Sequence, residues 1–342
     1  MNVLRSSTLL RNLAATAIFL VIGFLAVYSV DEYTAGTVAK LALYICAALG
    51  LTVLVGGNGQ ISLGHAALMA IGAYTMAKFL PSRTDDFGQV SIGVIVVGLI
   101  LAIAVTTLVG AVIGVAAARL RGPYLAGATL ALGVAVPGVT TYFHDTFNGE
   151  QGLPIPVPRL PASLESAGWT IGHVVALIAI ACAAVALLLM ANLKRSAVGR
   201  HLAAVRDHEI SAQLCGLSVP REQVRAFAFS AATAGVGGGL LGLVIQGANP
   251  HSFGLVLSLS VLGAVVIGGL GSLRGAIWGS IVVVYLDLIL KDELKVDPNA
   301  PAAAYGLLLI VVMLAMPGGI QGLLTRLGGR LPRRSAQPQG GN

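Results

Sequence analysis

Four polar residues next to a glycine-rich break are the first candidates for chemistry. Asn58, Gln60, Ser62 and His65 follow the break at 56–59 and precede an apolar run. Their amide, hydroxyl and imidazole groups offer hydrogen bonds to a polar solute. In an apolar surrounding such groups often mark a solute path, so we expect the four to line one. Ser62 and His65 are three apart and can share a helix face; the simpler interpretation of His65 is a histidine hydrogen-bonded to a neighbouring helix.

A second candidate is the polar interval 192–225, which carries six Lys or Arg and three Asp or Glu between strongly apolar flanks. From Arg200 to Cys215 it contains neither Pro nor Gly, and Gly216 follows. The sequence therefore predicts one short surface helix that ends at Gly216, and a new helix after Pro220. Such a helix between two spans can bind a cytoplasmic partner, and an ordinary solvated loop is the alternative.

Three glycines at four-residue spacing, Gly271, Gly275 and Gly279, predict a helix face that packs closely against another helix. Small residues at this spacing let two backbones approach each other inside a membrane. The glycines 237, 239 and 242 also match a dinucleotide fingerprint, but they lie in an apolar run with no preceding strand. We therefore reject a dinucleotide site.

The sequence does not indicate that the chain itself binds a nucleotide or a metal. None of the five lysines stands between Gly and Ser or Thr, as a phosphate-binding P-loop requires. Cys46 and Cys182 lie in apolar runs and Cys215 in the polar interval, which suits neither a disulfide framework nor a metal site. The basic residues sit in short loops and at the termini, where they set orientation rather than bind nucleic acid. We expect no cofactor and no metal.

The elements that must position these residues are membrane helices. The 342 residues are 56% hydrophobic and 10% charged, and their long apolar runs indicate an all-α, polytopic helical membrane protein. We expect about ten apolar segments, of which 60–80 and 122–143 contain Gly or Pro breaks typical of half-helices or re-entrant pieces. The ten segments are approximately 13–30, 36–56, 60–80, 90–118, 122–143, 169–191, 223–246, 252–271, 275–291 and 302–322.

The distribution of positive charge predicts how the chain lies in the membrane. With ten spans, fifteen Lys or Arg fall on one side and four on the other, which predicts that both termini are cytoplasmic. Residues 145–168, rich in Pro and Gly, then form an external loop. We expect a permease-like membrane domain over 1–326, with an uncleaved first span, and a disordered basic tail over 327–342.

Several blocks resemble the branched-chain amino acid permease family of ABC importers. They are GQISLGHAALMAIGAY at 59–74, RGPYLAGATLALG at 121–133, residues 199–242 and GGLGSLRGAIWG at 268–279. The first block resembles the M-type subunit, one of two related permeases that form a heterodimer. Together the blocks cover most of residues 41–325.

The resemblance implies a bacterial inner-membrane subunit with a second, H-type permease, an external solute-binding protein and two cytoplasmic ATPases that hold ATP and Mg²⁺. It implies that 192–222 is the loop that couples to an ATPase, and we expect the contact to involve Arg200, Arg206, Glu209, Ala212 and Gly216. Aligned on Gly216, the chain departs from the usual acid–Ala–Ala pattern, because Glu209 comes one position early.

Three alternatives stay open at this stage. The external block 147–152 is looser than the paired glycines usual in the family, and urea or amide importers use similar permeases. An ion-coupled secondary transporter would function without ATPases and would need an essential buried carboxylate, but no carboxylate lies securely in mid-membrane. A membrane-embedded enzyme would need a cluster of ionisable groups at one depth, which the sequence does not show.

Overall fold

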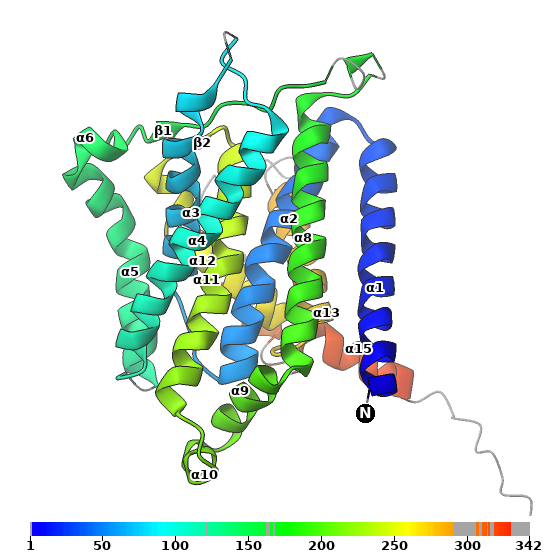
Figure 1. Ribbon diagram of the computed structural model, residues 1–342, viewed down its shortest axis with the longest axis vertical. Helices are drawn as coiled ribbons and strands as arrows, with labels where there is room; N and C mark the ends of the chain where they lie inside the picture. The colour runs from blue at the N-terminus through cyan, green and yellow to red at the C-terminus, as the bar shows by residue number, and fades with distance from the viewer. Residues whose placement is uncertain are drawn as a thin grey trace, which may run out of the picture.

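Helices run up and down through almost every segment of the molecule (Figure 1). The computed structural model describes residues 2–85, 87–120, 122–161, 165, 166, 168–290 and, with gaps, 306–329. The long helices are α1 (Asn2–Tyr28), α2 (Glu32–Leu51), α3 (His65–Phe79), α4 (Ile92–Ala117), α5 (Pro123–Tyr142), α8 (Ile171–Arg195), α11 (Val219–Val244), α12 (Leu255–Gly268) and α13 (Leu273–Leu288). The short elements are the π-helical η1 (Thr52–Gly57), η2 (Pro81–Arg83), α6 (His144–Phe147), β1 (Leu153–Pro154), α9 (Ala197–Asp207), α10 (Glu209–Leu214), β2 (Gly247–Ala248), η3 (Pro250–Phe253) and α15 (Gly319–Gly329).

The fold is that of an all-α, multi-pass membrane protein. Among the described residues, seven helices are long and apolar enough to cross a membrane. Helices α3 and α13 are shorter, with 15 and 16 residues. The last predicted segment, 302–322, is described only with gaps, so the number of about ten spans stays a prediction.

Serine side chains cap the N-termini of three helices. Ser91, Ser196 and Ser272 precede α4, α9 and α13, and each side-chain oxygen accepts a hydrogen bond from the backbone N–H three residues on, at 3.4, 3.3 and 3.2 Å. Such a bond satisfies one of the backbone donors that a helix start leaves unpaired.

Helix α11 lies at the centre of the bundle and packs against α2, α3 and α4. Its glycines make this packing close: a Cβ added at Gly238 would lie 1.9 Å from the Met69 carbonyl oxygen of α3. One added at Gly235 would lie 2.8 Å from the Thr106 hydroxyl of α4. At these contacts the backbone of α11 therefore lies directly against the neighbouring helices, and larger side chains would not fit.

Helices α12 and α13 pack through two of the three predicted glycines. A Cβ added at Gly275 would lie 2.5 Å from the Gly268 carbonyl oxygen. One added at Gly279 would lie 1.7 Å from the Ala264 carbonyl oxygen. Gly271 instead lies in the turn between the two helices, with a φ of 78°, and it meets Gly56. The expectation of one continuous three-glycine face was wrong at Gly271, because the helix starts only at Leu273.

Only one of the two predicted breaks is found. The chain is non-helical from Gly59 to Gly64 and α3 begins at His65, so segment 60–80 contains a break followed by a helix of 15 residues. Helix α5 instead continues through Pro137. The proline removes only the hydrogen bond to the carbonyl oxygen of Gly133, four residues earlier, and membrane helices tolerate such a loss. The Thr140 hydroxyl donates to the carbonyl oxygens of Val136 and Pro137 at 3.1 and 2.9 Å.

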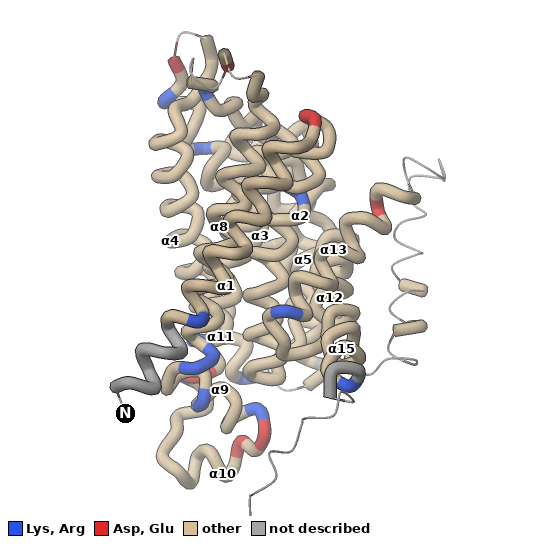
Figure 2. Tube along the Cα trace, turned by 90° about the vertical axis from the view of Figure 1, so that its right-hand side faces the viewer, with Lys and Arg blue, Asp and Glu red and all other residues tan. Residues whose placement is uncertain are grey.

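The two ends of the bundle differ. At one end lie α9, α10, α15 and the N-terminus, and at the other the segment 145–161, in which β1 pairs antiparallel with β2 (Figure 1). Figure 2 shows that Lys and Arg are more frequent at the α9–α10 end. Helix α15 extends to Gly329 and so includes the first three residues of the predicted tail. Residues 330–342 lie outside the described part of the chain.

Candidate functional site

The predicted polar residues lie in the break between α2 and α3. Here α2 widens into the π-helical turn η1, and Gly59 takes a φ of 74°, which glycine adopts without strain. The Asn58 side-chain amide donates to Gln60 Oε1 at 2.8 Å, and both side chains are buried. Asn58 Oδ1 and Gln60 Nε2 have no hydrogen-bond partner within the described residues. Because unpaired buried polar groups are costly, these two atoms are candidates for contact with water or a solute.

His65 and Ser62 do not share a helix face. His65 is the first residue of α3 and is fully buried, and its Nε2 donates to the Ala47 carbonyl oxygen of α2 at 3.1 Å. This contact supports the simpler interpretation of His65. Ser62 is also buried, but it precedes the helix. The expected common face was wrong because Ser62 lies before the first residue of the helix.

Two hydroxyl groups from other helices hold the break in place. Thr129 Oγ1 of α5 accepts from Leu63 N, and Ser258 Oγ of α12 accepts from Ala66 N, both at 3.0 Å. A Cβ added at Gly64 would lie 2.1 Å from the Thr129 carbonyl oxygen. The break is therefore a fixed part of the bundle, bordered by α5 and α12.

The polar interval forms two helices where one was predicted. Helix α9 begins at Ala197 and ends at Asp207, and His208 is extended, with φ −161° and ψ 99°, before α10 begins. No Gly or Pro marks this break. The prediction of a single helix from Arg200 to Cys215 was therefore wrong, because propensity alone does not show where the chain must bend to pack against itself.

Gly216 ends α10 in the predicted way. Its φ is 83°, its N–H bonds to the Gln213 carbonyl oxygen at 2.9 Å, and Leu217 N bonds to the Ala212 carbonyl oxygen at 3.0 Å. This pair of bonds is a Schellman cap. Ala212 itself is 4% exposed and packs with Val205, Leu217 and Val219. The expectation that Ala212 is open to a partner is thus contradicted, since the loop's own packing covers it.

Two of the exposed side chains of α10 are large and apolar. Ile210 is 65% exposed and Leu214 is 84% exposed. They are four residues apart, so they lie on one face of the helix, and Ala212 lies on the opposite, buried side. Sequence reasoning did not single out this exposed apolar pair.

Arg206 connects the two candidate sites. Its guanidinium donates from NH1 to the Gly56 carbonyl oxygen at 2.6 Å, across 150 positions of sequence. The same group bonds the Asp207 carboxylate at 2.9 and 2.7 Å. Arg200, by contrast, is exposed and reaches only the Arg195 carbonyl oxygen, and Glu209 is half-buried. Arg206 thus joins α9 to the last turn before the polar break.

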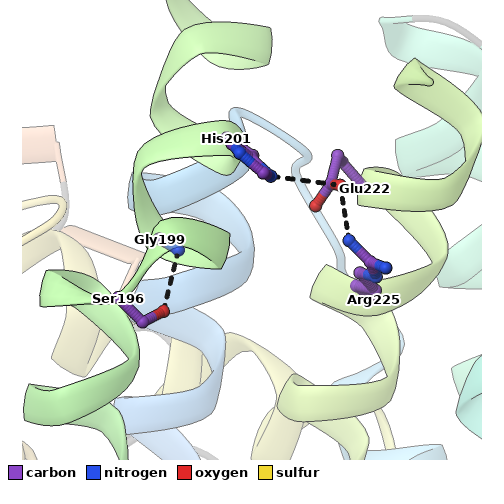
Figure 3. Close-up of polar contacts among 5 residues, drawn as sticks. All are labelled: Ser196, Gly199, His201, Glu222 and Arg225. Atoms are coloured by element: carbon purple, nitrogen blue, oxygen red, sulfur yellow. Dashed lines mark hydrogen bonds and ion pairs between the residues drawn. The ribbon is translucent and has the colours of Figure 1, made fainter. Parts of the chain in front are cut away.

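A buried carboxylate links α9 to the base of α11 (Figure 3). Glu222 is 4% exposed; its Oε1 accepts from Arg225 NH1 at 2.7 Å and lies 3.6 Å from His201 Nδ1 of α9. The spacing of Glu222 and Arg225 is a signal for a helical ion pair. The approach of His201 depends on the tertiary fold, and sequence reasoning missed it.

An apolar groove of about 740 Å³ lies between α3, α4 and α5, and its lining on α3 begins at Ala67, after the break. Val105 and Val136 line it together with Tyr74, and Lys78 and Arg83 lie toward its outer end. Its chemistry suits an apolar side chain more than an ion.

These features define the chain as a membrane transport permease subunit: a helical bundle with a broken span, buried uncharged polar groups and a helical loop tied to that break. The family model described as "Branched-chain amino acid transport system / permease component" matches residues 33–317. The chain belongs to this family, which confirms the resemblance. It is therefore a transport subunit and not an enzyme.

The curated relatives are of both permease types. The chain is 31% identical to the high-affinity branched-chain amino acid transport system permease protein LivM of Salmonella typhimurium, over 87% of this chain and 71% of the relative. It is 30% identical to LivM of Escherichia coli, over 86% and 71%. It is 25% identical to LivH of Escherichia coli, over 82% and 91%. No solved structure matches the chain.

Proposed function

We propose that this chain imports branched-chain amino acids as one permease of an ATP-driven transporter. The names of its LivM and LivH relatives, which are permease proteins of one transport system, support the substrate and a second permease. The observation that carries the mechanism is the Arg206–Gly56 hydrogen bond. It connects the loop that faces one side of the membrane to the polar break inside it.

In this mechanism two cytoplasmic ATPases bind ATP and Mg²⁺, and one of them docks on α10. The chain itself carries no P-loop sequence. Movement of α9 and α10 with the ATPase pulls on η1 through Arg206 and on α11 through the His201–Glu222 contact. The polar break then has a different geometry in each of two conformational states of the permease. The ATPases would favour one state and then the other, because their contact with the two states is unequal.

The path combines the two surfaces that a hydrophobic amino acid needs. Asn58, Gln60 and Ser62 offer neutral hydrogen-bonding groups, and the groove beside α3 offers apolar walls. An external binding protein would deliver the solute, and the second permease would complete the path.

The first test is substrate uptake. The chain, reconstituted with a second permease, ATPases and binding protein, is expected to take up leucine, isoleucine and valine only when ATP is supplied. Urea uptake without amino acid uptake would assign it to the urea or amide importers. Uptake driven by an ion gradient with no ATPase present would contradict the mechanism.

The orientation is also a proposal, and native Cys215 tests it. The excess of Lys and Arg at the α9–α10 end supports a cytoplasmic position for that end. Cys215 is exposed there, so a membrane-impermeant thiol reagent is expected to label it only after the inner membrane is opened. In a Cys215→Ser background, Gln151→Cys, exposed in the opposite loop, should react with the membrane intact. The reverse pattern would invert the topology.

A further inference from the structure

A groove with a basic rim lies outside the proposed path. It has a volume of about 860 Å³ and opens between α1, α8 and the start of α13, at the end of the bundle that carries α9. Four cationic side chains surround its mouth: Arg11, Lys194, Arg195 and Arg274. No Asp or Glu is among the residues that line it.

The four cations are not neutralised by the protein. Within the described ranges, every ion pair lies elsewhere and none includes a rim residue. Lys194 Nζ donates to the Gly271 carbonyl oxygen, a neutral group. All four side chains are exposed. Four uncompensated positive charges around one cavity form a site for an anion.

The inner wall of the same groove is apolar. Phe19 and Ile22 of α1 face Leu187 of α8 and Ile277 of α13 across it. Helix α1 packs mainly against α8, and near the rim the Asn12 amide donates to Asn192 Oδ1 at 2.7 Å. The groove therefore continues from a charged mouth along membrane-spanning helices, a shape that exceeds what a free phosphate ion fills.

We propose that this groove binds one anionic phospholipid of the surrounding membrane. The phosphate lies among Arg11, Lys194, Arg195 and Arg274, and an acyl chain lies along the apolar wall. Basic pockets between membrane helices recognise lipid head groups in this way. The bound lipid would fill the space between the peripheral helix α1 and the rest of the bundle. The proposal does not depend on the transported solute; the proposed orientation decides only which leaflet supplies the lipid.

The test is native mass spectrometry of the purified full chain, titrated with phosphatidylglycerol, with phosphatidylcholine and with inorganic phosphate. We expect one tight phosphatidylglycerol site and weaker phosphatidylcholine binding. Each basic residue near an anionic head group strengthens binding about fivefold. The double variant Arg11→Gln/Arg274→Gln is therefore expected to bind phosphatidylglycerol about 25-fold more weakly.

The matched control is Arg119→Gln/Arg326→Gln, which removes the same charge from exposed positions outside the groove. It should retain the tight site. Equal binding of the two lipids, or equal loss in both double variants, would overturn the proposal. So would saturation of the site by inorganic phosphate at the lipid's affinity, which would make it a free-anion site. Since no readout involves transport, failure here and failure of the import proposal are distinguishable.

Discussion

Replacing Gly279 by alanine is expected to destabilise the chain by about 3 kcal/mol, at the upper end of the usual cost of overpacking. The added Cβ would lie 1.7 Å from the Ala264 carbonyl oxygen and 2.6 Å from its carbon. These are backbone atoms of α12, so no side chain can rotate away, and the two helices must separate. The membrane level of the chain and its thermal unfolding midpoint in detergent should both fall.

The control for this substitution is Gly127→Ala in α5, where an added Cβ meets nothing within 4 Å. There alanine should be neutral or stabilising by up to about 1 kcal/mol, because it favours the helix over glycine. If both variants fell equally, or neither did, close packing of α13 on α12 would not be what Gly279 provides.

The double variant Ile210→Asp/Leu214→Asp is expected to lower ATP-dependent uptake at least about tenfold, equivalent to about 1.4 kcal/mol of lost docking. Both side chains are exposed on one face of α10, so the substitutions leave the loop's own packing intact. The membrane level of the chain should stay normal while the ATPases co-purify poorly. Uptake in vesicles and co-purification from the same membranes measure both effects.

Ala204→Asp provides the control, since Ala204 is exposed in the same loop but lies on α9 and not on α10. It should transport normally. Ala212→Arg is a poor test by comparison, because Ala212 is buried against Val205 and Val219, and the loop itself would be disrupted. Normal uptake in the aspartate double variant would mean that α10 is an ordinary solvated helix.

The features predicted correctly from the sequence are those with a local physical cause. Apolar runs of span length require helices in a membrane, and the glycines at 56–59 marked a true break. Gly216 ended its helix because a left-handed residue is least strained as glycine. The same local logic failed at Pro137, where the helix continues because an internal proline removes only one of its backbone hydrogen bonds.

What could not be predicted depends on contacts between distant segments. The residue types do not indicate that Arg206 bonds the Gly56 carbonyl oxygen 150 positions away. They also do not indicate that His201 lies beside Glu222. The bend at His208 and the burial of Ala212 have the same origin, since they follow from packing within the loop. Sequence spacing identified the candidate side chains, but only the fold showed which residues they contact.

The π-helical turn η1 makes this region sensitive to insertions and deletions as well as to substitutions. A π-helical turn holds an additional residue in the helix. Deleting one residue from Thr52–Gly57 would narrow this wide turn to α-helical geometry. The Gly56 carbonyl oxygen would then leave the position in which it accepts from Arg206. The number of residues between α2 and Asn58 is therefore itself part of the site.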